Sequence, residues 1–318
     1  MSSVLHFLNY DHIREDLQNL YNSLDHAKTK WKQLRTYADR EQVQLATVVR
    51  QSGIPEMNRL CYQSLNSTSP VEEVVLDIQG ILINHNLPPY NKKNELPSNA
   101  FFAQQNVVLS GFGTSGFLQY EQAISFIDRK FQMSVKEGLY DPYKPNYVDH
   151  YFTIEASNQF FHRRNRIAQA MPLTFSAEVD PKGILTKAAG QGLVHLEDNS
   201  VQYFSKQHMI IGEEKICRFE ITNPSIFRPG QLVEVQVSFT IRQVRGRFKM
   251  FIVLRSIAML SDEHLCNAEL ASLREVKQPE RSLKRRIGYD EEEEKEVVET
   301  RQSMARMVIS DLATKCSS

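Results

Sequence analysis

Apolar residues in the first fifty positions recur at the spacing of a helix, as at Ile13, Leu17, Leu20 and Leu24. This spacing places them on one face, the pattern of an amphipathic helix. The same period predicts helical structure over 31–48. A further helix is predicted over 69–81, where Pro70 and the two acids after it suit a first helical turn. Residues 1–83 are therefore predicted to form a helical region.

The pattern changes in residues 84–151, which are rich in proline, asparagine and other polar residues at both ends, over 84–99 and 140–151. Such stretches are typical of loops. We predict a linker and irregular segment with a short helix here, and we place the main domain boundary just before Phe152.

After the boundary the apolar period shortens to about two, which indicates strands. Val233 to Ile241 alternate with polar residues from Glu234 to Arg242, which predicts one buried face and one solvated face. The next run, 248–260, is apolar on both faces and is predicted to pair with it as a long antiparallel hairpin. The strands predicted in this region are 173–179, 201–204, 216–221, 231–244 and 248–260.

The predicted fold class is therefore α+β, with a helical N-terminal region and a small antiparallel β-barrel or sandwich that is OB-like. Helices are predicted to follow it, over 262–277 and from Asp290 onward, where four glutamates favour the start of a helix. The predicted domains are 1–83, 84–151, a β-rich core with its following helix at 152–277, and a charged C-terminal helix at 278–318.

Composition restricts the class of protein. The 318 residues are 41% apolar, contain no run long enough for a membrane helix and have no secretory signal at the start. The four cysteines are isolated, which fits a reducing compartment and disfavours a structural zinc site. We expect an intracellular protein, nuclear or cytoplasmic, with no membrane contact, no cofactor and no metal. The cysteines are Cys61, Cys217, Cys266 and Cys316.

Charge is distributed unevenly although the net charge is zero. Residues 161–260 contain 14 basic and 8 acidic side chains, whereas the segments on either side are each slightly acidic. A basic domain between acidic flanks indicates an anionic partner.

Motifs of catalysis are sparse. Gly111, Gly113 and Gly116 form a G-x-G-x-x-G pattern between a strand-like and a helix-like run, but no repeated βα pattern surrounds it. A glycine-rich loop that enters a helix is the favoured interpretation, and a nucleotide-binding enzyme is a remote alternative. Neither an H-E-x-x-H nor a G-x-S-x-G motif is present, so we predict no catalytic residues.

Basic residues form the strongest candidate site. They lie at the turn of the predicted hairpin, with no acid between Glu234 and Asp262, and in a second run that follows His162. Small barrels with such hairpins hold the phosphates of single strands by charge and stack bases on aromatic rings. In the alternative interpretation, the arginines only keep the hairpin soluble and prevent its strand edges from pairing with those of another sheet. The predicted nucleic-acid-binding residues are Arg242, Arg245, Arg247, Lys249, Arg163, Arg164 and Arg166.

Two alternatives remain open. The protein could instead be a non-enzymatic scaffold that associates with itself or with a protein partner through its helices. The run 282–286, Ser-Leu-Lys-Arg-Arg, could be a nuclear import signal or a charged linker neutralised by the glutamates after it.

Three segments of the C-terminal half resemble segments of a known protein family. They are 227–239, 244–260 and 282–289, and together they resemble a large multicopy family of uncharacterised proteins of mushroom-forming fungi over about residues 140–307. The high copy number of that family is similar to that of genes carried by mobile elements, which would imply a nucleic-acid partner. The resemblance supplies no catalytic residue.

Overall fold

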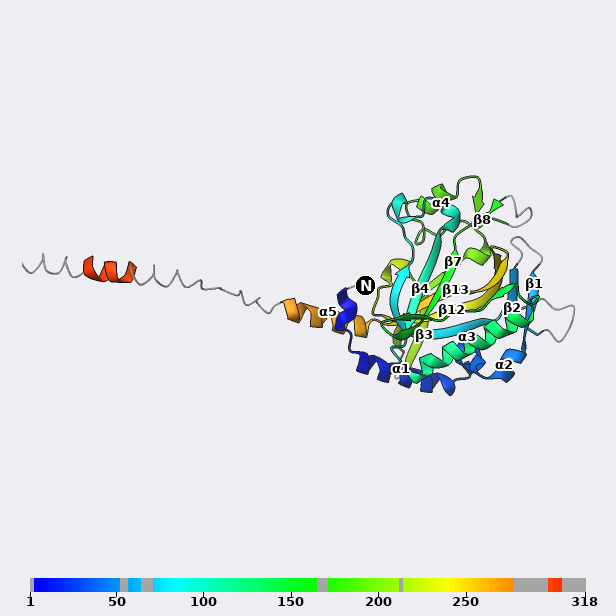
Figure 1. The fold of residues 1–318 in the computed structure, drawn as a ribbon, viewed down its shortest axis with the longest axis horizontal. Helices are drawn as coiled ribbons and strands as arrows, with labels where there is room; N and C mark the ends of the chain where they lie inside the picture. The colour runs from blue at the N-terminus through cyan, green and yellow to red at the C-terminus, as the bar shows by residue number, and fades with distance from the viewer. Residues whose placement is uncertain are drawn as a thin grey trace, which may run out of the picture. The chain divides into compact units, whose positions relative to one another are not determined.

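The computed structural model describes residues 3–51, 57–63, 71–164, 171–211, 214–276 and 297–304. The chain divides into two compact units, 1–273 and 274–318. In the second unit, residues 297–304 are helical. The α-helices labelled in Figure 1 are α1 (Tyr10–Asp25), α2 (Arg40–Gln44), α3 (Ser115–Met133), α4 (Ile184–Ala189) and α5 (Glu263–Val276). The strands are β1 (Ala46–Gln51), β2 (Met57–Tyr62), β3 (Val75–Asn86), β4 (Gln104–Ser110), β5 (Tyr140–Asp141), β6 (Asn146–Val148), β7 (Tyr151–Gln159), β8 (His162–Arg163), β9 (Leu193–Val194), β10 (Gln202–Ile211), β11 (Glu214–Ile221), β12 (Leu232–Val244) and β13 (Arg247–Ser261).

A closed barrel forms the centre of the first unit (Figure 1). Its five strands are hydrogen-bonded in the ring order β12, β3, β4, β7, β13, and pairing of β13 with β12 closes it. All of these neighbours are antiparallel except β7 and β13, which are parallel. Strands β1 and β2 extend the sheet beyond β12, and β10 and β11 extend it beyond β13. The fold is thus mixed α+β with a β-barrel, as predicted at that level.

The β12–β13 hairpin confirms the clearest sequence prediction. Its turn consists of Arg245 and Gly246, which have φ angles of +52° and +84°. Two successive positive φ angles match the right-handed twist of the strands, which is why such turns are favoured in hairpins. Val235, Val237 and Phe239 of β12 are fully buried, as the alternation predicts.

Helices α1, α2 and α3 gather on one side of the barrel, whereas α4 and β8 lie on the opposite side (Figure 1). Tyr120 of α3 is buried and its hydroxyl donates a hydrogen bond of 2.8 Å to Oε1 of Gln79 on β3. On the α4 side, Phe160, Phe161 and Leu185 form a second, smaller apolar cluster. Contacts of this kind fix the helices to the sheet.

The predicted helical region is only partly helical. Helix α1 is confirmed. The predicted helical run 31–48 holds short helices but ends in strand β1, and the helix predicted over 69–81 is wrong, because strand β3 begins at Val75. The reason is burial: 76–82 of β3 are buried throughout, and an apolar run covered on both faces has no period that separates helix from strand. The barrel therefore takes β3 and β4 from before residue 152, and the expectation that β structure begins there is wrong.

Other elements agree with prediction in part. Helix α5, β10 and β11 lie where they were expected, but 173–179 is not a strand and instead ends in a turn. Arg166, the run 282–286 and the glutamates 291–294 lie outside the described residues. Among the described residues, no helix has the length and apolar character needed to cross a membrane.

A basic cavity beside diverging strands

A large hollow lies where strands β7 and β13 of the barrel diverge. Strands β7 and β13 pair at one position, Ser157 with Val253. Toward the hairpin turn, β13 pairs instead with the short strand β5, at Phe248 and Lys249. The divergence leaves a cavity of about 1670 Å³ between β7, the hairpin, the segment 134–146 and the residues Phe101 and Phe102.

Arg242 of β12 lies in the wall of this cavity. Its guanidinium is 4.1 Å from the centre of the Phe251 ring, and its Nη1 donates a hydrogen bond of 3.0 Å to Oε1 of Gln159. Burial lowers the pKa of Arg242 from its usual value. Within the described part of the chain, no carboxylate lies at ion-pair distance from it. Arg242 is partly buried. A partly buried cation without a directly bonded anion is costly, and such groups cluster at functional sites.

Arg163 and Lys249 face the same cavity from other elements. Arg163 follows β7 on β8 and its guanidinium lies 4.7 Å from the centre of the Phe101 ring. A smaller hollow of about 540 Å³ next to it is lined by Arg163, Phe101 and Arg164. Four predicted residues thus line two hollows that share Arg163 and Phe101. Lys136 and Lys144 add two exposed cations to the larger one.

Aromatic rings accompany these cations. Phe102 is 60% exposed at the cavity, an unusual state for a phenylalanine in a folded protein. Phe101 and Phe251 are partly buried under the two arginines. The Phe102 ring packs edge-on against Phe101, with 5.2 Å between the ring centres. Planar guanidinium groups stacked on rings, with a further ring partly exposed beside them, form a surface suited to flat aromatic ligands.

Three other described residues of the predicted set do not line the main cavity. Arg245 is exposed in the hairpin turn and does not line the hollow. Arg247 forms an ion pair of 2.5 Å with Asp141 and donates to the carbonyl of Tyr140. Of the predicted set, Arg242, Arg163 and Lys249 line the main cavity, and Arg164 lines only the smaller one.

Acidic side chains from distant parts of the chain neutralise Arg255, which lies toward the open end of the hairpin. Arg255 of β13 forms ion pairs of 2.9 Å with both Glu73 and Asp198. Arg59 of β2 pairs with the same two carboxylates, at 2.6 and 2.9 Å. Burial alone would raise the pKa of Asp198, but Arg255 and Arg59 outweigh it and lower that pKa to about 2. The four residues form one network of ion pairs.

The polar face of β12 was expected to face water, and this expectation is wrong. Ser238 and Thr240 are buried, and the Ser238 hydroxyl accepts a hydrogen bond of 2.9 Å from Nε of Arg255. Gln236 donates to Asp77 of β3 at 3.1 Å. Alternation indicates the polarity of a strand face, but a second polar layer can cover that face when most of its groups find partners. Among the described residues, the Thr240 hydroxyl is buried without a hydrogen-bond partner.

The glycine motif has a packing role. Gly111 lies in the loop between β4 and α3, and a Cβ there would lie 2.3 Å from atoms of Phe117. At Gly116 a Cβ would lie 2.2 Å from Tyr21. The strands around the loop are antiparallel, unlike those of a dinucleotide-binding domain. Close packing of α3 on its neighbours therefore accounts for two of the three glycines.

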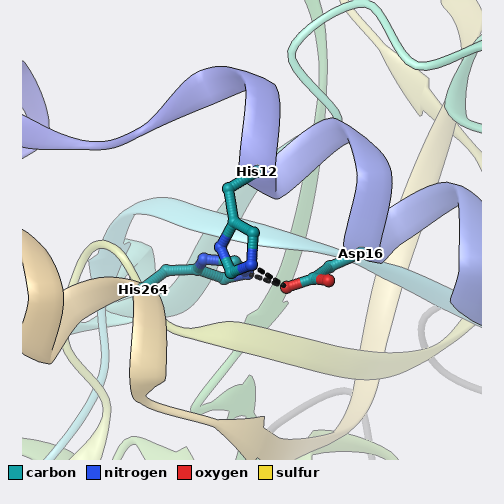
Figure 2. Close-up of side chains that lie close together, drawn as sticks. All are labelled: His12, Asp16 and His264. Carbon is teal, nitrogen blue, oxygen red and sulfur yellow. Dashed lines mark ion pairs between the residues drawn. The ribbon is translucent and has the colours of Figure 1, made fainter.

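Sequence reasoning missed a second cluster, formed by His12, Asp16 and His264 (Figure 2). His12 and Asp16 are four residues apart on α1, and His264 comes from α5. The spacing of the first two places them on one helix face, and this signal was available in the sequence. The third residue is distant along the chain and could not be assigned to them.

Comparison of the chain with protein-family models, curated proteins and solved structures finds no match. The resemblance to a fungal multicopy family therefore stays a prediction.

Proposed function

We propose that the protein binds single-stranded nucleic acid in the basic cavity. The observation that carries this proposal is the convergence of Arg163, Arg242 and Lys249, from three separate elements, on one hollow that also presents phenylalanine rings. Cations hold phosphates without regard to sequence, and rings stack on unpaired bases. The proposal includes the predicted OB-like class of the barrel, because OB-folds bind oligonucleotides across their strands.

The size of the cavity favours a polymer over a small molecule. Pockets for small ligands enclose roughly 300–1,000 Å³, whereas this cavity has about 1670 Å³ and adjoins a second basic hollow. The shared residues Arg163 and Phe101 give a path from Lys249 to Arg164. A strand of several nucleotides fits such a path better than one nucleotide does.

The charge balance supports an anionic occupant. Two acids line the main cavity, and Asp141 is held by Arg247. Glu155 accepts a hydrogen bond of 3.3 Å from the amide of Asn106. Five basic side chains line the same hollow, so the cavity has a net positive charge.

Fluorescence anisotropy tests the proposal. Labelled oligo-thymidine, oligo-uridine and a duplex of equal length are titrated with the full chain at several salt concentrations. We expect single strands to bind better than the duplex, with a slope of log K against log salt of roughly −2 to −3.5 for three to five phosphate contacts. Absence of single-strand binding at low salt contradicts the proposal, and so does a preference for the duplex.

Self-association is a second candidate function. Leu270 and Leu273 of α5 are 53% and 61% exposed, and their spacing places them on one helix face. A second copy of the chain would cover them. Light scattering of the full chain and of its Leu270→Glu variant tests this candidate: a dimer that dissociates in the variant supports it, and a monomer in both contradicts it.

A further inference from the structure

Two imidazole rings and one carboxylate converge between α1 and α5 (Figure 2). Nε2 of His264 lies 3.3 Å from Oδ2 of Asp16, and Nε2 of His12 lies 3.7 Å from the same oxygen. The three candidate ligand atoms all lie within 4.8 Å of one another. Figure 2 shows the three side chains pointing toward a common centre.

The two nitrogen–oxygen distances are close to those of one coordination geometry, and the two histidine nitrogens, which lie within 4.8 Å of each other, complete that geometry when a metal draws them together. Zinc ligands lie about 2.0–2.2 Å from the metal, so two corners of a tetrahedron around zinc are about 3.3–3.5 Å apart. Adjacent corners of an octahedron at the same bond lengths are closer, at about 3.0 Å. The distances of 3.3 and 3.7 Å between nitrogen and oxygen are nearer to the tetrahedral value. Two imidazoles and a carboxylate are also a ligand set that zinc accepts.

Exposure distinguishes the three side chains. His264 is 5% exposed, whereas His12 and Asp16 are 42% and 38% exposed. The buried imidazole is held in place by its surroundings, and the other two groups leave one side of the cluster open to water. Three protein ligands with an open fourth position are the arrangement of accessible zinc sites, whereas structural sites have four protein ligands.

We propose that His12, Asp16 and His264 form a binding site for Zn²⁺, with water as the fourth ligand. The site is separate from the basic cavity and does not depend on the proposed function. Because its ligands come from α1 and α5, bound zinc would link the helix after the barrel to the helix before it. Leu265 of α5 already packs beside Gly230, and Glu269 of α5 forms an ion pair of 2.9 Å with Arg228. The metal would add a further attachment.

The test is zinc binding by the full chain after treatment with a chelator. Isothermal titration measures affinity and stoichiometry, and Co²⁺ in place of zinc reports geometry, because four-coordinate cobalt absorbs visible light more strongly than six-coordinate cobalt. We expect one ion per chain and a four-coordinate cobalt spectrum. Zinc should also raise the melting temperature of the chain.

The variants are His12→Gln, Asp16→Asn and His264→Gln. Loss of a group that merely supports a ligand costs about 10- to 100-fold in metal affinity, so loss of a direct ligand should cost at least about 10-fold. His26→Gln is the matched control because His26 is an exposed histidine at the end of α1, and Cys266→Ser excludes capture by the nearby thiol.

Circular dichroism shows which variants fold, and the exposed positions 12 and 16 keep the test valid if the variant at buried position 264 does not. Zinc affinity that is unchanged in both His12→Gln and Asp16→Asn overturns the proposal. Absence of stoichiometric binding by the unaltered chain overturns it as well.

Discussion

The two ends of the β12–β13 hairpin use basic residues in different ways. Near its base, Arg255 is held between Glu73 and Asp198. Toward its turn, Arg242 and Lys249 face a cavity, and in the described part of the chain neither has a carboxylate at ion-pair distance. In the sequence all three belong to one stretch without acids. The difference arises because acids from other elements form ion pairs with Arg255 and, near the turn, with Arg247, but not with Arg242 or Lys249. Which charges are neutralised must therefore be judged from the folded structure.

Replacing Arg255 is the strongest way to test the contrast. Arg255→Met leaves Glu73 and Asp198 with one fewer cation in a largely buried site. Loss of one partner from a buried pair costs about 3–5 kcal/mol, and partial exposure of both acids places this case near the lower value. We expect a loss of about 3 kcal/mol in the free energy of unfolding, measured with urea.

Lys249→Met is the matched control, since Lys249 is an exposed cation of the same strand. It should change the free energy of unfolding by less than about 0.5 kcal/mol. Equal effects of the two variants would show that the ends of the hairpin do not differ.

Two carboxylates near the hairpin should respond to pH in opposite directions. Burial and the neighbouring Glu234 raise the pKa of Asp77 to about 6, whereas its usual value is 3.8. A raised folded-state pKa favours folding below about pH 4, and this contribution is lost as pH rises through 6. For Asp198, with a pKa of about 2, stability is present above about pH 4 and is lost as pH falls toward 2.

Asp77→Asn removes the first effect. At neutral pH the ionised carboxylate lies among amides, and the substitution should stabilise the protein by about 2 kcal/mol. Urea unfolding at pH 4.5 and pH 7.5 measures the effect, and equal gains at both values would contradict the assignment.

Removing the exposed ring of Phe102 should have a smaller effect than the substitutions above, and the effect should be on nucleic-acid binding alone. Phe102→Ala should weaken oligo-thymidine binding by about 1–2 kcal/mol, roughly 5- to 30-fold, because stacking contributes about 1–3 kcal/mol per base. Met133→Ala is the control: Met133 is 78% exposed and does not line the cavity. Anisotropy titration compares the two, and an equal, small change in both would remove stacking from the account.

The fold could be predicted from the sequence where the signal was local, and could not be predicted where it depended on burial or on contacts between distant residues. The hairpin was predictable because alternation in 233–241 is local and its turn residues are adjacent. Strand β3 was not, because burial of both faces removes the period that marks a strand. Ring closure depends on the pairing of β12 with β3 and of β4 with β7, which are contacts between distant residues.

The site followed the same rule. Arg242, Lys249 and Arg163 were identified because basic residues cluster along the chain. Pairing of Arg247 with Asp141 and of Arg255 with Asp198 required the folded chain. Phe102 carried no local signal that it would be exposed at a cavity, so the aromatic part of the site could not be assigned to particular rings.

Two variants of one hairpin test the central claim most directly. Lys249→Glu and Arg245→Glu make the same change in net charge a few residues apart, but only Lys249 lines the cavity. The account predicts that Lys249→Glu weakens single-strand binding about 10-fold and reduces the salt slope by about 1, while Arg245→Glu stays within about 2-fold of the unaltered chain. Equal losses in both variants would mean that net charge, and not the cavity, determines binding.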